Sequence, residues 1–458
     1  MATQRLAAWA VSLQYTDLPE PVTQAAVRSF YNWAGCALGG SNHRTTTTAL
    51  EALAPFFGPA TSSILGRTSQ SKAADNNLNL PSRADASHAA LINGIASHVH
   101  DYDDTHLETI IHPTGPVASA LLAQAEALGN VDGQQFILAL VAGIEAECKL
   151  GLAVWPKHYD VGWHITSTTG SIGAAVAVGK ILHLSEEQMA HAIGIAATQV
   201  TGLREMFGSD TKSFHVGRSA QNGLMAAILA SKGYTSSLQA LEAKRGWANV
   251  VSETQRLDGH IATLGQVWEI GKNSFKPFPC GIVVHPVIDG CIQLHQEMKE
   301  KGFSSAGIKS VHCRVHPLVL ELTGKKTPQD GLQAKFSVYH GGAAGLVLGK
   351  AGPAQYDDKV VRCEDITSVR DKIDAVADNK LGADEAEIVA EFSDGHKLTK
   401  HVTHAIGSLE VPMTDKQLQD KFIDQVTQVL GSQKASEASQ SCWTIGNAAN
   451  AGDFVRTL

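Results

Sequence analysis

The spacing of apolar residues divides this chain into two kinds of structure. Over residues 22–264 they recur at intervals of three and four, which is the pattern of helices with one buried face. Within this region Ser185 and Gln188 have the spacing of a capping box that opens a helix over 186–203. In SVHCRVHP, residues 310–317, apolar and polar side chains alternate instead, and this period of two predicts a half-buried strand.

The later part of the chain combines such strands with helices. Residues 386–402 are predicted to form two strands joined by a turn at Asp394 and Gly395, because a turn dipeptide separates two runs of strand-forming residues. Helical spacing is found around 335–350 and 367–379. These elements predict a small α+β domain.

The tail from Thr414 to Leu458 has helical spacing again, so the α+β segment lies between two helical ones. With 458 residues, 43% of them hydrophobic, the chain can bury a large core and divide into two domains. We expect a mainly α protein with an α+β insert. A large helical-bundle domain would comprise residues 1–268 completed by 406–458, and a smaller α+β lid domain would comprise 269–405.

The charge pattern and the N-terminal sequence argue against several classes of partner. The formal net charge is −8 with both signs interspersed, so a phosphate backbone would find no continuous basic stripe. No run of 18 or more apolar residues occurs, and Arg5, Trp9 and Gln14 interrupt the apolar residues that a signal peptide would need. We therefore expect no nucleic-acid or membrane partner, and an intracellular, cytoplasmic protein with a mitochondrial location left open.

The cysteines lie far apart and include no Cys-x-x-Cys pair. An odd number at such spacing argues against a disulfide framework and against a cysteine-rich zinc site. We expect most of them to be buried thiols. They are Cys36, Cys148, Cys280, Cys291, Cys313, Cys363 and Cys442.

One short stretch concentrates titratable side chains. HVHDYDDTHLETIIHPTG, residues 98–115, holds four acidic residues and four histidines. The helix that runs into this stretch is predicted to end near Asp101, so the polar residues that follow would lie on a turn and a loop. They are Asp101, Asp103, Asp104, Thr105, His106 and His112.

Three interpretations of this stretch remain open. A surface loop would have the same composition. An aspartate beside a histidine can also orient the imidazole for acid/base catalysis near neutral pH. Carboxylates and histidines can bind a divalent cation, but the stretch has neither an EF-hand pattern nor a His-x-x-x-His pair, and we expect no metal.

Two helix starts carry further candidates. His164 precedes a Thr- and Ser-rich helix start, whose free N–H groups and positive dipole end suit a substrate carboxylate. The same histidine could equally belong to the core. Lys212, His215 and Arg218 gather cationic donors just ahead of a helix of small residues. They could bind carboxylates or be ordinary charges of an exposed loop.

A proline-stiffened loop lies near the expected domain boundary. In NSFKPFPCGIVVHPVIDG, residues 273–290, Lys276, Cys280 and His285 stand beside the prolines. Ligand pockets often form between domains. Taken together, the four stretches predict a pocket rich in Asp, His and Lys between the two domains.

These motifs resemble those of the MmgE/PrpD family and occur in the same order. The resemblance rests on HDYDDTH with HPTG, the small-residue helix after GWHITSTTG, TKSFHVGRSAQNG, FKPFPCGIVVH, AKFS and VPMTDKQLQDKF, and it spans nearly the whole chain. The family includes 2-methylcitrate dehydratase, cis-aconitate decarboxylase and iminodisuccinate epimerase. The resemblance implies a homodimer with a large helical domain and a smaller lid-like α+β domain, and chemistry without a metal or an organic cofactor.

The resemblance also implies roles for individual residues. It identifies His112 and His164 as proton-transfer groups, while Lys212 and Lys276 would hold substrate carboxylates. The full expected set has the catalytic residues His112, His164, Asp101 and Lys212, and the substrate-binding residues Thr105, Lys276, Arg218, His215 and Cys280.

Some residues differ from the family's motifs, and these differences help to decide which branch of the family the chain resembles. Asp103 and the HPTG motif at 112–115 differ from the dehydratase pattern, so the chain resembles the decarboxylase and epimerase branch more closely. Cys280 and Gly281 stand where some cis-aconitate decarboxylases carry a histidine. Asn32 stands where the family commonly has an aspartate, and we expect it to serve helix packing.

The expected function follows from the resemblance. It is a metal-free lyase that acts on a small di- or tricarboxylate by His-mediated proton transfer, most closely a cis-aconitate decarboxylase. A 2-methylcitrate or alkylcitrate dehydratase, an iminodisuccinate-type epimerase and a catalytically silent acid-binding paralogue are the alternatives.

Overall fold

The computed structural model describes residues 1–67, 80–456 and 458, which group into two compact units. The helical unit comprises Met1–Val99, Asp103–Ser274 and Asp415–Leu458, and the α+β unit comprises His100–Tyr102 and Phe275–Thr414. The short segment 100–102 belongs to the α+β unit, because the Tyr102 hydroxyl donates to the Pro277 carbonyl at 3.0 Å. The protein is mainly α with a small α+β portion, as the sequence predicts.

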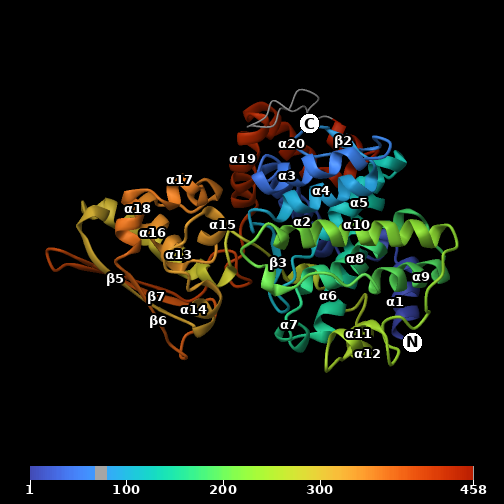
Figure 1. The fold of residues 1–458 in the computed structure, drawn as a ribbon, viewed down its shortest axis with the longest axis horizontal. Helices are drawn as coiled ribbons and strands as arrows, with labels where there is room; N and C mark the ends of the chain where they lie inside the picture. The colour runs from blue at the N-terminus through green and yellow to red at the C-terminus, as the bar shows by residue number, and fades with distance from the viewer. Residues whose placement is uncertain (68–79, 457) are drawn as a thin grey trace. The chain divides into compact units, whose positions relative to one another are not determined.

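The helical unit is built around one buried helix. Every residue of α8 (Ile165–Ile181) except Lys180 is buried, and α5, α6, α9 and α10 pack against it (Figure 1). The described helices of this unit are α1 (Ala2–Ser12), α2 (Glu20–Gly39), α3 (Arg44–Leu53), α4 (Ala86–His98), α5 (Thr114–Leu128), α6 (Gly133–Val154), α7 (Lys157–Asp160), α8, α9 (Glu186–Ala197), α10 (Thr211–Ser231), α11 (Trp247–Val251), α12 (Leu257–Ile261), α19 (Asp415–Leu430), α20 (Ser432–Trp443) and α21 (Asp453–Arg456). Its short strands include β1 (Ser62–Ser63), β2 (Arg83–Ala84) and β3 (Asp104–His106).

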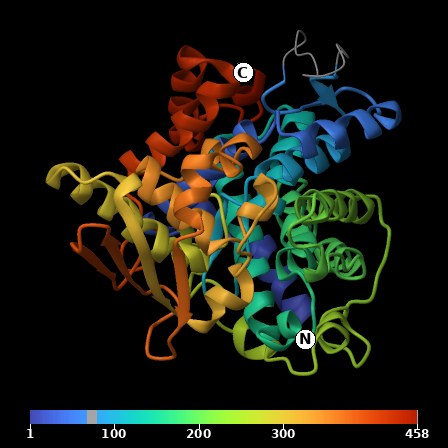
Figure 2. The ribbon, with the colours of Figure 1, turned by 60° about the vertical axis from the view of Figure 1, so that its left-hand side comes forward.

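The end of the chain completes the helical unit. Helices α19 and α20 pack against α2, so helices from the two ends of the sequence share one unit (Figure 2). Tyr31 of α2 stacks on Trp443 with ring centres 4.1 Å apart and lies 4.7 Å from the ring of Phe422. Asn32, also on α2, accepts a hydrogen bond from the buried Lys421 Nζ at 2.7 Å. Asn32 therefore joins α2 to α19, which agrees with the expected packing role.

Glycines allow the central helices to approach closely. A Cβ atom added at Gly217 of α10 would lie 2.2 Å from the Leu91 carbonyl oxygen of α4, and one added at Gly94 would lie 2.6 Å from Gly217 Cα. Gly143 of α6 and Gly173 of α8 face each other in the same way, with the added Cβ atoms 2.7 and 2.8 Å from the opposite carbonyl oxygens. Real Cβ atoms do not approach backbone atoms so closely, so these contacts require glycine.

We expect Gly217→Ala to lower the free energy of unfolding by about 1–3 kcal/mol, because the added methyl group must push α4 away from α10. Gly259→Ala in α12 is the matched control, since its Cβ would meet no atom within 4 Å and alanine favours a helix. Urea unfolding of both variants beside the wild type measures the difference. Equal stability of Gly217→Ala and the wild type would contradict the close packing.

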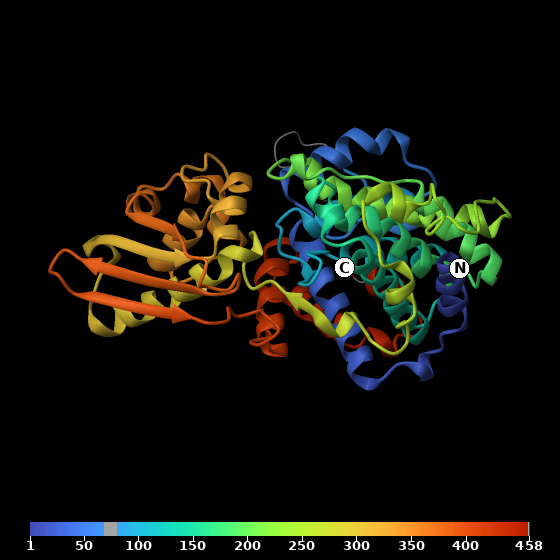
Figure 3. The same cartoon turned by 90° about the horizontal axis from the view of Figure 1, so that it is seen from below.

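The α+β unit contains a four-stranded sheet in the order β6-β5-β7-β8 (Figure 3). Its strands are β5 (Ile308–Val315), β6 (Ile373–Ala377), β7 (Ala386–Phe392) and β8 (Lys397–Val402). β5 pairs in parallel with β6 and antiparallel with β7, which pairs antiparallel with β8. The helices are α13 (His285–Lys301), α14 (Pro317–Thr323), α15 (Gly331–Ala334), α16 (Val338–Leu348), α17 (Asp358–Val361) and α18 (Glu364–Arg370), and β4 (Asn273–Phe275) runs up to this unit.

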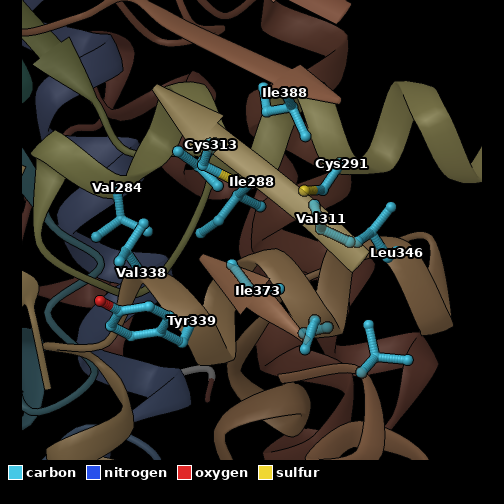
Figure 4. Close-up of a cluster of buried hydrophobic side chains, with 14 of the residues drawn as sticks. Val284, Ile288, Cys291, Val311, Cys313, Val338, Tyr339, Leu346, Ile373 and Ile388 are labelled. Atoms are coloured by element: carbon cyan, nitrogen blue, oxygen red, sulfur yellow. The ribbon is translucent and has the colours of Figure 1, made fainter. Parts of the chain in front are cut away.

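The core of the α+β unit lies between the sheet and two of its helices. Helices α13 and α16 pack on each other and on strands of the sheet. Figure 4 shows Ile288 and Cys291 of α13 beside Val311 and Cys313 of β5. From Val311 to Val315 alternate residues of β5 are buried, because a strand with one covered face turns every second side chain inward.

The predictions of a capping box, a pair of strands and mostly buried thiols are confirmed. The Ser185 capping box forms at α9, and 386–402 folds into the expected pair of strands. Six cysteines are buried and Cys363 is exposed, and the described residues contain no disulfide. Of the helices in the described ranges, none combines the length and the apolarity that a bilayer span requires.

Two predicted helices are wrong in extent. The helix expected over 367–379 ends at Arg370, and Ile373–Ala377 forms β6. This strand has only five residues, so its alternation is too short to outweigh the helical spacing before it. The helix expected over 186–203 ends at Ala197, and Leu203 lies beyond it in a bridge with Trp163.

Candidate active site

Three histidines lie at or near the N-termini of three helices in the helical unit. His112 precedes α5 by two residues, His164 is the N-cap residue of α8, and His215 lies near the start of α10. Two hydrogen bonds hold these helix starts together. The backbone N–H of His112 donates to Thr166 Oγ1 at 3.1 Å, and the ring atom His164 Nδ1 lies 3.0 Å from His215 Nδ1. The positive ends of three helix dipoles therefore converge around the imidazoles, an arrangement that favours anions.

The proton of the neutral His112 ring lies on Nδ1. This atom is 2.7 Å from the Asp104 carbonyl oxygen and 3.3 Å from Thr105 Oγ1. A carbonyl oxygen can only accept, so Nδ1 must donate the hydrogen bond. Nε2 then carries the lone pair and can take up a proton. His112 is thus held in the tautomer that a general base needs, and its protonated form would be a general acid at the same atom.

His164 and His215 form a pair with linked tautomers. Because their Nδ1 atoms share one hydrogen bond, one ring must donate and the other must accept. The donor then carries a lone pair on Nε2, and the acceptor carries an N–H there. Burial, followed by the charge of Lys212, lowers the pKa of His164 well below its usual range, and burial lowers the pKa of His215 to about 4. The pair is neutral at pH 7 and offers one proton acceptor and one donor.

A further histidine, which no sequence motif singles out, joins this cluster. His98, the last residue of α4, donates from Nδ1 to Asp103 Oδ2 at 2.8 Å, and both side chains are fully buried. Its ring centre lies 4.8 Å from that of His112 and 6.0 Å from that of His164. The only hint in the sequence is the short separation of His98 and Asp103, which does not show where the side chains point.

The loop that carries these acidic residues is buried, so its interpretation as a surface loop is wrong. Asp103, Asp104 and Thr105 are inaccessible to solvent. Asp104 accepts hydrogen bonds from the Thr114 hydroxyl and the Asn273 side-chain amide. Burial, with the charge of Asp103, raises the pKa of Asp104 to about 6. The loop is therefore a fixed part of the core that places the His112 ring.

Lys212 and Arg218 differ in their surroundings. Helix α10 begins at Thr211, so the expectation that these cations precede the helix is wrong. Its first turns, which contain the cations, continue directly into the small-residue part of the same helix. Lys212 is half-buried, and its Nζ lies 5.3 Å from the ring centre of Phe207. Arg218 is exposed and donates to Gln221 Oε1 at 2.6 Å. Lys212, whose charge acts on both histidines of the pair, is thus the better placed anion-binding group.

The other expected site residues belong to the α+β unit. Lys276 is buried and its Nζ contacts the Asp101 carboxylate at 2.7 Å and the Asp101 carbonyl oxygen at 3.2 Å. Asp101 has a left-handed backbone with φ of +51°, a conformation that is uncommon outside glycine. Burial raises the pKa of the Cys280 thiol to about 12, so this side chain is an uncharged thiol at neutral pH.

One group of side chains in the helical unit, of which two are buried and Glu108 is exposed, resembles a metal site by spacing alone. Donor atoms of His106, Glu108 and Glu269 lie within 4.8 Å of one another. Glu269, however, already accepts from Lys149 Nζ at 2.6 Å and from Lys272 Nζ at 2.8 Å. Two ammonium groups thus supply the positive charge that a metal ion would bring, and the donor set does not suit a divalent cation.

Comparison with known proteins identifies the family. The MmgE/PrpD N-terminal domain matches residues 4–260, and the MmgE/PrpD C-terminal domain matches residues 278–445. A cis-aconitate decarboxylase-like protein of Aspergillus oryzae is 24% identical over 480 residues, covering 100% of this chain and 97% of its own. The cis-aconitate decarboxylase of Mus musculus is 28% identical over 357 residues, covering 74% of this chain and 72% of its own.

A second activity occurs among the relatives. The 2-methylcitrate dehydratase of Escherichia coli is 23% identical over 251 residues, covering 50% of this chain and 51% of its own. The two matching domains together cover most of the 458 residues, in the order that the sequence motifs imply. This chain therefore belongs to the MmgE/PrpD family.

Proposed function

We propose that this enzyme, a lyase of the MmgE/PrpD family, releases CO2 from a small tricarboxylate of the cis-aconitate type. The observation that carries the proposal is the convergence of His112 and the His164–His215 pair at three helix N-termini, with Lys212 beside the pair. Such a site combines proton transfer with positive charge. These are the two requirements of a reaction at a carbon next to a carboxylate.

The positive charge needs no metal ion in this proposal. Lys212 and the free N–H groups at the starts of the three helices would bind substrate carboxylates. Lys276 is the second lysine implied by the family resemblance, and its ion pair with Asp101 would have to exchange for a substrate carboxylate. Thr105, which contacts His112 Nδ1, would act by fixing that ring.

The proposed reaction releases one CO2 and takes up one proton. The bond between the methylene carbon and its carboxylate breaks, and CO2 leaves. The electron pair of that bond forms the new double bond, and the pair of the old double bond takes a proton from a histidine ring nitrogen. His112 or His164 supplies this proton, and solvent later restores it.

Dehydration is the second candidate. It is supported by the likeness of half of the chain to the 2-methylcitrate dehydratase of Escherichia coli. In that reaction one histidine removes a proton beside a carboxylate and another protonates the departing hydroxyl group. Epimerisation, which the family resemblance also implies, would move one proton between two faces of a carbon and release nothing.

Proton NMR with cis-aconitate in buffered D2O containing EDTA tests the proposal. We expect vinyl signals of an itaconate-type product, with one deuterium at the carbon that receives the proton. Unchanged cis-aconitate would remove the decarboxylase assignment for this substrate, and 2-methylcitrate would then be the next substrate to test. Tight binding of both acids in calorimetry without turnover would favour a silent acid-binding protein.

We also propose that the protein is a homodimer, as the family resemblance implies. Helix α10 exposes four large apolar side chains, each at least 36% accessible, which is the kind of surface that protein interfaces cover. They are Phe214, Met225, Ile228 and Leu229. Sedimentation equilibrium measures the mass, and a single species of 48.5 kDa would contradict the dimer.

A further inference from the structure

We propose that Asp103 and His98 form a positioning pair for the acid/base chemistry, in which one buried carboxylate holds both His98 and His112 by their Nδ1 sides. This inference rests on the proposed function and adds two residues to it. It concerns positioning, because the pair acts through the ring of His112.

The geometry of the carboxylate carries the inference. Asp103 Oδ2 accepts from His98 Nδ1 at 2.8 Å, while Asp103 Oδ1 lies 3.7 Å from His112 Nδ1. The aspartate thus lies between two imidazoles whose ring centres are 4.8 Å apart. Both rings turn their Nδ1 atoms to the 103–104 segment of the loop, so Nε2 is the atom that each can use for proton transfer.

Burial strengthens the interaction of the Asp103 carboxylate with the two histidine rings. The side chains of His98 and Asp103 are fully buried, and that of His112 is 6% exposed. A buried carboxylate is costly unless charged or polar partners surround it, and its attraction for an imidazolium is strong where water is excluded. Asp103 would therefore stabilise a proton on either ring and fix the direction in which the ring presents it.

The other charged groups around the cluster act against such a proton. The charge of Lys212 on α10 acts on this histidine cluster and would repel an imidazolium. His164 of α8 and His215 of α10 are neutral at pH 7, so they would add to this repulsion only at low pH. Burial raises the pKa of the neighbouring Asp104 to about 6, so Asp104 loses its negative charge as the pH falls toward that value. Asp103 is the carboxylate that lies against both His98 and His112, so its negative charge would offset this repulsion.

Asp103→Asn is the first test. The amide keeps the size of the side chain but removes the charge, so we expect kcat to fall roughly 10- to 100-fold, as for other groups that orient a reacting ligand. The limb of the kcat pH profile that reports the histidine should move to lower pH by about one unit or more, because a nearby negative charge favours the imidazolium.

His98→Gln is expected to move the same limb in the opposite direction. The carboxylate then acts on His112 alone, and the competing positive charge of His98 is gone. Opposite shifts in the two variants distinguish the positioning pair from a merely structural role, which would lower stability and leave both limbs in place. Shifts in the same direction, or no shift in either variant, would overturn the inference.

His106→Gln is the matched control. His106 is equally buried on the same loop, but it contacts Thr109 Oγ1 at 2.8 Å and Glu269 Oε2 at 3.2 Å, away from Asp103. We expect this variant to lose stability without a shift of the pH profile. A shift as large as that of His98→Gln would overturn the inference.

A measurement that does not depend on enzyme turnover can test this inference independently of the proposed reaction. Long-range ¹H–¹⁵N spectra of histidine-labelled protein report which ring nitrogen carries the proton. We expect Nδ1 protonation of His98 in the wild type and loss of this fixed tautomer in Asp103→Asn, with His106 unchanged. A wild-type His98 without a proton on Nδ1 would overturn the pair even in an active enzyme, whereas an inactive enzyme with this tautomer would overturn only the decarboxylase proposal.

Discussion

Replacing His112 by glutamine is expected to lower kcat by roughly 10²- to 10⁴-fold, the usual contribution of an acid/base group. Glutamine can still donate a hydrogen bond to the Asp104 carbonyl oxygen, so the loop keeps its anchor while Nε2, the proton-transfer atom, is lost. His164→Gln should have an effect of the same order, because it also breaks the linked tautomers of the His164–His215 pair. Steady-state kinetics with the substrate identified by NMR gives both values.

His158→Gln is a suitable control for these two variants. His158 is buried and makes two hydrogen bonds, to the Val251 carbonyl oxygen at 3.0 Å and to Thr168 Oγ1 at 2.7 Å. Burial lowers its pKa to about 4, as it does for His215, but its neighbours are Trp163 and Trp247 and not the histidine cluster. We expect His158→Gln to lose stability and to keep kcat within a few-fold, about 1 kcal/mol in the barrier. Full activity of His112→Gln or His164→Gln would remove that residue from the mechanism.

The sequence predicts elements whose signals lie within a few neighbouring residues. The capping box at Ser185 needs only a side chain three residues ahead, and the turn at Asp394 and Gly395 joins strands that follow each other directly. Strand β6 shows the limit of such signals. Its five residues are stabilised by the parallel pairing with β5, more than fifty residues earlier, and no local pattern reports such a pairing.

The candidate site shows the same limit. Composition identifies the stretch from His98 to Gly115 as unusual, but a surface loop and a buried acid/base site have the same composition. The difference lies in tertiary contacts, such as the hydrogen bond from Asn273 to Asp104, across 169 residues of sequence. The resemblance to the family supplies His112, His164 and Lys212, whereas His98 becomes visible only through the turn of α4 that points its ring at Asp103.

A second buried charge cluster, outside the histidine site, leads to the largest expected change in stability. Glu269 accepts from Lys149 Nζ at 2.6 Å, from Lys272 Nζ at 2.8 Å and from His106 Nε2 at 3.2 Å. The side chain of Lys149 is 1% exposed and that of Glu269 is 2% exposed. Although burial alone would raise the pKa of Glu269, these hydrogen bonds and the charge of Lys149 hold it well below its usual range.

We expect Glu269→Ala to lower the free energy of unfolding at pH 7 by about 3–5 kcal/mol, because it leaves the ammonium group of Lys149 buried without its carboxylate. A carboxylate with a lowered pKa stabilises the folded state above its unfolded-state pKa of about 4.5, and this contribution is lost as the pH falls through the folded-state value. The difference in free energy of unfolding between wild type and variant should therefore have its full size at pH 7 and become smaller below about pH 4.5.

Urea unfolding at pH 7 and at pH 4 measures this difference. Glu108→Ala is the matched control, since Glu108 is 58% exposed and lies 3.8 Å from Lys272 Nζ. An exposed ion pair of this kind contributes about 0–1 kcal/mol, so the control should unfold close to the wild type. Equal losses in the two variants would show that the Lys149–Glu269 pair adds no more than a surface contact. A loss confined to Glu269→Ala, smaller at pH 4 than at pH 7, would show that this buried pair ties α6 to the segment that precedes β4.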